Sequence, residues 1–124
     1  MFLAVAVYFL NETGQVHFFY WKYWWYDIMM HFLGGFVVSG FGSWVYICPT
    51  SSNSMTLRRT LALSVGIGMS IGIGWELFEY FNGIYADQPG IVADTAGDLF
   101  MDCIGSIVSG LVVYCTFIRL RCIE

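Results

Sequence analysis

Three long apolar stretches, at residues 28–48, 61–81 and 98–118, constrain this chain more than any other feature. Each has the roughly 20 residues that an α-helix needs to cross the hydrocarbon core of a bilayer. Over the whole chain 58% of the residues are hydrophobic and 11% are charged, which lies outside the usual range of soluble domains. The sequence therefore predicts an all-α integral membrane protein with a bundle of three spanning helices. Between the last two spans, Asn-Gly and Pro-Gly pairs predict an exposed loop over residues 82–97.

The N-terminal region is less regular than this core. Residues 1–10 are apolar but too few to span a bilayer alone, and a polar segment follows them at once. Next comes VHFFYWKYWWY, in which eight of eleven residues are aromatic, as in the belt of rings at the headgroup level. The first ten residues are either a truncated fourth helix or an interfacial segment. We divide the single membrane domain, 1–124, into an N-terminal apolar and aromatic interfacial segment, 1–26, and a three-helix core, 27–118.

The charge argues against nucleic-acid binding, and the cysteine spacing argues against a disulfide framework. The net charge is -4, and the five basic residues form no stripe, so we do not expect the chain to bind nucleic acid. The four cysteines have no CxxC spacing, and three of them fall in or beside apolar helical stretches. Cysteine in such a place commonly behaves as a small apolar residue, so the sequence does not predict a disulfide framework.

The arginines predict an orientation in the membrane. Arg58 and Arg59 lie between the first two spans, and Arg119 and Arg121 follow the third, so alternation puts both pairs on one side. The positive-inside rule makes that side cytoplasmic, and Lys22 alone argues mildly against it. We therefore expect an integral protein of a bacterial or archaeal cytoplasmic membrane, with a cytoplasmic C-terminus.

Acidic residues gather at the other, outer end of the three predicted helices. Within each helix they are spaced three or four residues apart, so that each set can point in one direction. One histidine joins them at the start of the first span. These residues are the candidate metal ligands: Asp27, His31, Glu76, Glu79, Asp94, Asp98 and Asp102.

Placing such acids in a membrane is costly, at about 2.5 to 3.5 kcal/mol for an aspartate at the centre of a spanning helix. The arginines cannot offset this charge, because about 30 Å of hydrocarbon separates the two faces. Either several acids are protonated, or a multivalent cation lies among them. Oxygen ligands with one imidazole suit magnesium, calcium, manganese, iron or zinc, and the pattern leaves the choice of divalent ion open.

Some of these residues have simpler explanations. Asp27 and Asp94 could equally be helix N-caps, where a carboxylate accepts from free backbone N–H groups. Glu79 lies close enough to the end of its helix to be solvated. Glu76, Asp98 and Asp102 lie within apolar helix and have the poorest alternative explanation, because ionisable residues inside a membrane usually serve a function.

Small residues line all three predicted helices and would let them approach closely. They are Gly34, Gly35, Gly40 and Gly42 in the first, Gly66, Gly68, Gly72 and Gly74 in the second, and Gly105, Ser106, Ser109 and Gly110 in the third.

Three ordered motifs carry a resemblance to a known family. They are Asp27-x-x-x-His31-Phe-x-Gly-Gly, Trp75-Glu76-x-x-Glu79, and Asp94-Thr95-x-x-Asp98-Leu99-x-x-Asp102-x-x-Gly105. Together they resemble the YjdF-like bacterial inner-membrane proteins and, more distantly, the VanZ-like membrane proteins, which tend to carry glutamine and asparagine where this chain has Glu79 and Asp102. The resemblance covers residues 27–110 and implies a membrane fold in which the acids act together, but no settled activity. YjdF-like proteins usually have further helices before this core, so the chain resembles a shortened version.

Three functions fit these observations. The first is a metal-binding membrane protein, with the ion serving an enzyme that acts on a lipid or lipid-linked substrate; the pattern assigns no catalytic residue and leaves open whether the protein is an enzyme. The second is a small structural or accessory subunit, or a homo-oligomer, since three thin helices leave many side chains uncovered. The third is a cation or proton transporter component. A transporter needs a polar path to the cytoplasm, which the inner halves of the helices supply only as Ser39, Ser43, Thr60, Ser64 and Thr116.

Overall fold

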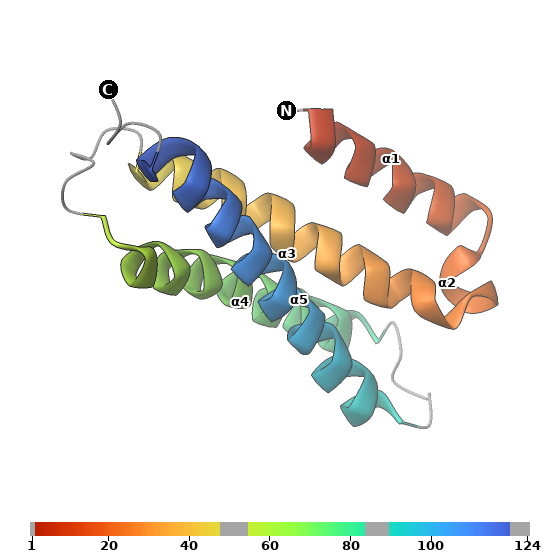
Figure 1. The fold of residues 1–124 in the computed structure, drawn as a ribbon. Helices are drawn as coiled ribbons and strands as arrows, with labels where there is room; N and C mark the ends of the chain where they lie inside the picture. The colour runs from red at the N-terminus through yellow and green to blue at the C-terminus, as the bar shows by residue number, and fades with distance from the viewer. Residues whose placement is uncertain (1, 48–54, 84–89, 120–124) are drawn as a thin grey trace.

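The computed structural model describes residues 2–47, 55–83 and 90–119, and this part of the chain consists of helices joined by short turns, with no strand among the described residues (Figure 1). The helices are α1 (Phe2–Val16), α2 (Phe19–Lys22), α3 (Trp24–Ile47), α4 (Leu57–Asn82) and α5 (Ile91–Val113), which a π-helix (Tyr114–Arg119) continues. Three helices are long and apolar enough to cross a membrane: Trp24–Ile47, Leu57–Asn82 and Ile91–Thr116. The predicted all-α membrane bundle with three candidate spans is therefore confirmed. Cys48 and Cys122, and the side chains of Arg119 and Arg121, lie outside the described residues.

The spanning helices begin earlier than the apolar stretches suggest. α3 takes in the last aromatic residues of the N-terminal segment, starting at Trp24. α4 starts at Leu57, because the side chain of Thr56 caps it by accepting from the backbone N–H of Arg59 at 3.3 Å. α5 starts at Ile91, after Gly90 turns the chain with a φ of 99°, a conformation that glycine adopts readily. Our prediction of a loop over residues 82–97 was therefore wrong from Ile91 onward.

The earlier helix starts also exclude one simple explanation for two acids. The N-cap of α5 is Gly90, and Asp94 lies inside the first turn of the helix. Asp27 likewise lies in the first turn of α3 rather than before it. Both carboxylates can still interact with the positive end of a helix dipole, but neither is a cap.

The first helix, α1, is longer than the apolar stretch at residues 1–10, because it continues through the polar residues that follow. With 15 residues it extends over about 22 Å, less than the thickness of the hydrocarbon core. Two tyrosines bond to it, Tyr26 from α3 and Tyr20 from α2. The Tyr26 hydroxyl donates to the carbonyl of Leu10 at 2.7 Å, and the Tyr20 hydroxyl donates to the side chain of Asn11 at 2.8 Å. The assignment of residues 1–26 to the membrane interface remains a prediction.

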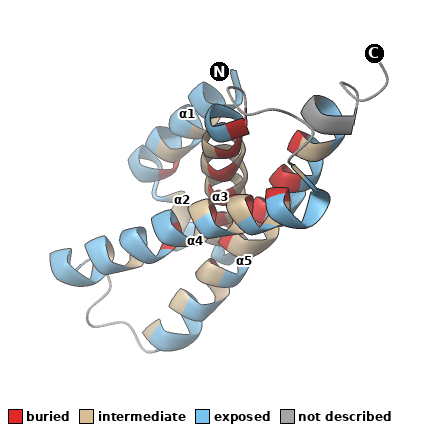
Figure 2. Ribbon diagram, turned by 90° about the vertical axis from the view of Figure 1, so that its left-hand side faces the viewer, coloured by how far each residue is buried: buried red, intermediate tan, exposed pale blue. Residues whose placement is uncertain are grey.

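The core of the bundle is made of small and hydroxyl-bearing residues. A Cβ on Gly35 would lie 2.8 Å from the Cα of Asp102, and one on Gly105 would lie 2.9 Å from the backbone nitrogen of Phe36, so α3 and α5 touch backbone to backbone. Figure 2 shows the buried positions along the inner faces of the helices and the exposed end of α4 and start of α5. The fully buried side chains with the largest volumes are Thr60, Ser39, Ser43, Ser64, Ser106 and Ser109.

A compact apolar cluster closes the bundle at the end where α3 and α5 finish. Ile47 and Val113 are buried there, with Met55, Leu63 and Tyr114 packed around them. The hydroxyl-bearing core therefore ends in an apolar contact on this side. The acidic residues lie at the opposite end.

Candidate metal centre

The chain direction of the three long helices gathers the acidic residues. α3 and α5 begin at the end of the bundle where α4 finishes, as Figure 1 shows. The first turns of α3 carry Asp27 and His31, and the last turns of α4 carry Glu76. Asp98 and Asp102 follow one another by one helical turn on α5. Side chains as far apart in the sequence as His31 and Asp102, which are separated by 71 residues, therefore meet at one place.

His31 lies at the centre of this group, with its ring 8% exposed. Its Nδ1 atom is 3.1 Å from the Oδ2 atom of Asp102. Its other nitrogen, Nε2, lies 3.8 Å from the Oδ1 atom of Asp27 and 4.0 Å from the Oε1 atom of Glu76. The two ring nitrogens therefore face different acids, one on α5 and the others on α3 and α4.

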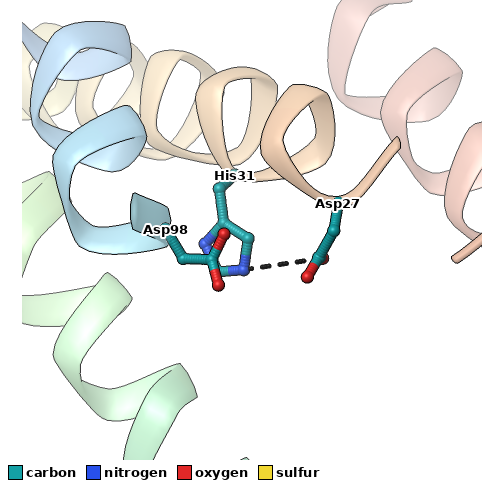
Figure 3. A group of neighbouring side chains, drawn as sticks. All are labelled: Asp27, His31 and Asp98. Carbon is teal, nitrogen blue, oxygen red and sulfur yellow. Dashed lines mark ion pairs between the residues drawn. The ribbon is translucent and has the colours of Figure 1, made fainter. Parts of the chain in front are cut away.

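Asp27, His31 and Asp98 form the tightest set of metal-ligating side chains in the described part of the chain. Each of the three offers a ligand atom, and these atoms all lie within 4.8 Å of one another. Figure 3 shows Asp27 and His31 projecting from the same side of α3, while Asp98 approaches the ring from α5. Asp98 is 4% exposed, so its carboxylate lies within the bundle. Such a set could hold a metal ion.

Glu76 adds a fourth carboxylate from the third helix. Its Oε1 atom is buried and has no hydrogen-bond partner among the described residues, although the side chain as a whole is 12% exposed. A buried polar atom without a partner costs roughly 1 to 3 kcal/mol, and more if it is charged. Since this atom points toward Nε2 of His31 at 4.0 Å, its missing partner would lie in the space between them.

Asp102 is held more tightly than the other acids. It is 4% exposed, and its carboxylate lies against Gly72 of α4, where a Cβ would come within 3.0 Å of its Cγ. Its backbone lies against Gly35 of α3, and its carbonyl accepts a hydrogen bond of 2.7 Å from the Ser106 hydroxyl. Close packing on two sides therefore fixes the position of this carboxylate.

Glu79 and Asp94 lie toward the outside of the group. Glu79 is half-buried, and its charge interacts with those of Glu76 and Asp27. Asp94 is exposed, and its charge interacts with those of Asp98 and Asp27. Both are near enough to feel the cluster, but neither belongs to the closest set of ligand atoms.

No ion pair between described residues joins a lysine or an arginine to this group. In each of its three ion pairs the basic partner is His31, which is charged only when protonated. One imidazole faces the carboxylates of Asp27, Glu76 and Asp102, with Asp98 beside them. The arrangement is strongly acidic in a region where charge is poorly solvated.

The sequence pattern predicts Gly72 and Ser106 as small residues on helix faces but does not assign them to the site. In the structure Gly72 contacts the carboxylate of Asp102, and the Ser106 hydroxyl donates to the Asp102 carbonyl. A signal was present, since Gly72 precedes Glu76 by one helical turn and Ser106 follows Asp102 by one turn. That spacing places them on the face of the acids, but it does not tell which side chain on the facing helix they will contact.

Comparison with known proteins identifies one family. The family described as predicted membrane protein (DUF2238) matches residues 1–119. No curated protein and no solved structure matches the chain. The family agrees with the membrane fold that the motifs imply, the YjdF-like resemblance stays a prediction, and the VanZ-like resemblance finds no support.

Proposed function

We propose that this chain, which belongs to the predicted membrane protein family (DUF2238), binds a divalent metal ion at the acidic end of its helical bundle. The ligands we assign are the Nε2 atom of His31 and the carboxylates of Asp27, Asp98 and Glu76. Three spanning helices each contribute at least one of them. The remaining candidates from the sequence, among them Glu79 and Asp94, lie around this set.

One observation carries the proposal: ligand atoms of Asp27, His31 and Asp98 lie within 4.8 Å of one another. Metal ligands bind at about 2.0 to 2.2 Å, so donors that share one ion lie about 3 to 4 Å apart. The Nε2 atom of His31 is already 3.8 Å from Asp27 and 4.0 Å from Glu76. Small side-chain movements would bring Asp27, His31 and Asp98 to a common ion, and Glu76 would join them from its position beside Nε2.

Charge supports the same assignment. Three carboxylates without a basic partner other than a histidine are costly in a membrane. A divalent cation would offset two of these charges, and it would also give the buried Oε1 atom of Glu76 a partner. The single imidazole favours manganese, iron or zinc over magnesium and calcium, which prefer oxygen ligands alone.

The place of the site suggests what the ion would act on. The ligands lie near one end of the candidate spans, and the adjoining end of α4 and start of α5 are exposed. A lipid headgroup or a lipid-linked molecule could reach the site there. A bound ion would polarise a phosphoryl or carbonyl oxygen, and Glu79 would be available as a general base. By the distribution of arginines, we assign this end to the outer face of the membrane.

A second candidate function is that of a subunit in a larger membrane assembly. At most 33% of the residues in the apolar window of any candidate span are buried within the chain, and most residues of α4 are exposed and therefore open to lipid, to a second copy or to a partner. A basic partner could pair with the acids in place of an ion. A transporter is less well supported, because Ile47 and Val113 close the other end of the bundle with an apolar contact.

The proposal is tested by elemental analysis of the detergent-purified protein. The wild type, Asp98→Asn, Glu76→Gln and the control Glu12→Gln, which changes an exposed acid on α1, are compared after incubation with divalent ions and removal of the excess. We expect close to one ion per chain in the wild type and the control, and a loss of the ion in the two site variants. A wild type that retains no metal would contradict the proposal and favour the subunit.

A further inference from the structure

The two nitrogens of the His31 ring have different surroundings, and this difference separates Asp102 from the other acids. Nδ1 is at hydrogen-bond distance, 3.1 Å, from Asp102 Oδ2, whereas Nε2 is 3.8 Å or more from the nearest carboxylate oxygens. A neutral imidazole carries a proton on one nitrogen and a lone pair on the other. A carboxylate at 3.1 Å favours the proton on Nδ1, which leaves the lone pair on Nε2.

We infer that Asp102 is a positioning residue: its carboxylate accepts the Nδ1 proton of His31 and thereby directs the Nε2 lone pair toward Asp27, Asp98 and Glu76. The inference rests on the proposed metal site and goes beyond it, because it removes Asp102 from the ligands that the sequence pattern suggests. Histidine ligands commonly donate their second ring N–H to a carboxylate, which fixes the tautomer and the ring orientation.

The packing around Asp102 supports this role. Gly72 on α4 and Gly35 on α3 leave no room for a side chain beside Asp102, and the carboxylate is 6% exposed. Asp102 also lies one helical turn further from the start of α5 than Asp98, on the far side of the ring from Asp27 and Glu76. A group held in this way can orient a ring well. It cannot easily move to meet an ion on the other side of that ring.

The structure also provides a way to disturb Asp102 without replacing it. A Cβ on Gly72 would come within 3.0 Å of the Asp102 Cγ, so Gly72→Ala must displace the carboxylate. A Cβ on Gly74, two residues further along the same helix, has no heavy atom within 4 Å. Gly74→Ala is therefore a matched control that makes the same change on α4 without contacting Asp102.

The first experiment reads the tautomer directly, by nitrogen NMR of the imidazole in protein labelled with ¹⁵N-histidine. The chain has two histidines, and His17→Gln leaves only the His31 ring to be observed. The spectrum is recorded on the neutral ring in the presence of a chelator. We expect the proton on Nδ1 in this background and in Gly74→Ala, and a shift of the proton toward Nε2 in Asp102→Asn and Gly72→Ala. A proton on Nε2 in the unperturbed background would overturn the inference.

The second experiment measures the affinity for zinc, added alone, for the same variants. Loss of a partner behind a ligand typically lowers metal affinity by about 10- to 100-fold, so Asp102→Asn and Gly72→Ala should bind one ion more weakly. If Asp102→Asn instead removes the ion altogether, as Asp98→Asn is expected to do, then Asp102 is a ligand and the inference is wrong. If the wild type binds neither zinc nor, in the elemental analysis, any other divalent ion but shows the Nδ1 tautomer, and Asp102→Asn loses that tautomer, the proposed function fails and the positioning role stands.

Discussion

The two ends of the bundle are built by the same packing but contain opposite chemistry. At one end, glycine contacts bring α3, α4 and α5 together around His31 and the buried carboxylate of Asp102. At the other end, equally close contacts enclose neutral hydroxyls and finish in the apolar pair of Ile47 and Val113. Both ends satisfy the need for close helix packing in a membrane, where small residues let backbones approach.

The comparison leads to an expectation about which residues serve the fold. Neutral hydroxyls can bond to a nearby carbonyl, as Ser64 does to the carbonyl of Ser106 at 2.7 Å, and they stabilise the bundle at little cost. Buried carboxylates that share one histidine as their basic partner are costly, and the other end of the bundle is closed without such groups. We therefore expect the acidic end to carry groups that the fold does not require, as a functional site does.

The largest effect is expected where two backbones touch between the two ends. Gly105→Ala would place a Cβ 2.9 Å from the backbone nitrogen of Phe36 and closer still to the carbonyl of Phe32, and neither can move aside. We expect a loss of about 3 kcal/mol or more, measured by thermal unfolding in detergent. Gly97→Ala, also on α5 and with no heavy atom within 4 Å, should leave stability unchanged or slightly raised. Equal behaviour of the two variants would contradict the close contact of α3 and α5.

The next largest effect should separate the loss of stability that a buried carboxylate causes from the stability that metal binding adds. In the presence of a chelator, Asp98→Asn removes a buried charge and should stabilise the protein by about 1 to 2 kcal/mol. With manganese or zinc at about a hundred times the dissociation constant, the free energy of unfolding of the wild type should rise by about 2.7 kcal/mol. The wild type should then be more stable than Asp98→Asn. Unfolding curves recorded with and without metal test this crossing. If the Asp98→Asn variant is less stable than the wild type under both conditions, Asp98 serves the fold.

A smaller effect is expected among the serines at the neutral end. Ser64→Ala removes the hydrogen bond to Ser106 and should cost about 0.6 to 1.7 kcal/mol. The hydroxyl of Ser43 is buried without a partner among the described residues, so Ser43→Ala should be neutral or stabilising by up to about 1 kcal/mol. Neither change should alter metal content, which elemental analysis can verify. Loss of metal in Ser64→Ala would mean that the two ends are not independent.

The smallest effect is expected at the edge of the acidic end. Asp94 is exposed, so Asp94→Asn should change stability by less than about 0.5 kcal/mol and should retain the metal ion. Titration with zinc would measure any change in affinity. A loss as large as that of Asp98→Asn would extend the ligand set to Asp94, as the sequence pattern suggested.

The sequence predicts the fold better than it predicts the details of the site. Apolar length is enough to find three spans, and helical spacing is enough to bring Asp27, His31 and Asp98 to one end. It does not tell how far each helix is rotated about its axis, and this rotation decides that Asp102 faces Nδ1 while Asp27 and Glu76 face Nε2. The rotation depends on contacts between helices, such as Gly72 with Asp102, that only the assembled bundle contains.

The sequence also failed to predict where some helices begin and end. The apolar pattern places Asp94 in a loop, but the helix begins at Ile91 because Gly90 turns the chain there. Likewise, the polar residues after residue 10 continue α1, where Thr13 bonds back to the carbonyl of Phe9 at 2.7 Å. Polar residues near the end of a short helix can satisfy local backbone groups, so polarity alone is a poor guide to where such a helix ends.

The depth of His31 has an electrical consequence. His31 is the eighth of the 24 residues of α3, about 10 Å along a helix of about 36 Å. An ion that enters from the acidic end and reaches the ring therefore crosses about a third of the voltage across the membrane. Moving one elementary charge through the whole potential changes its energy by about 2.3 kcal/mol per 100 mV. For a divalent ion this amounts to about 1.5 kcal/mol per 100 mV, so the dissociation constant of the site would change about tenfold for each 100 mV of membrane potential.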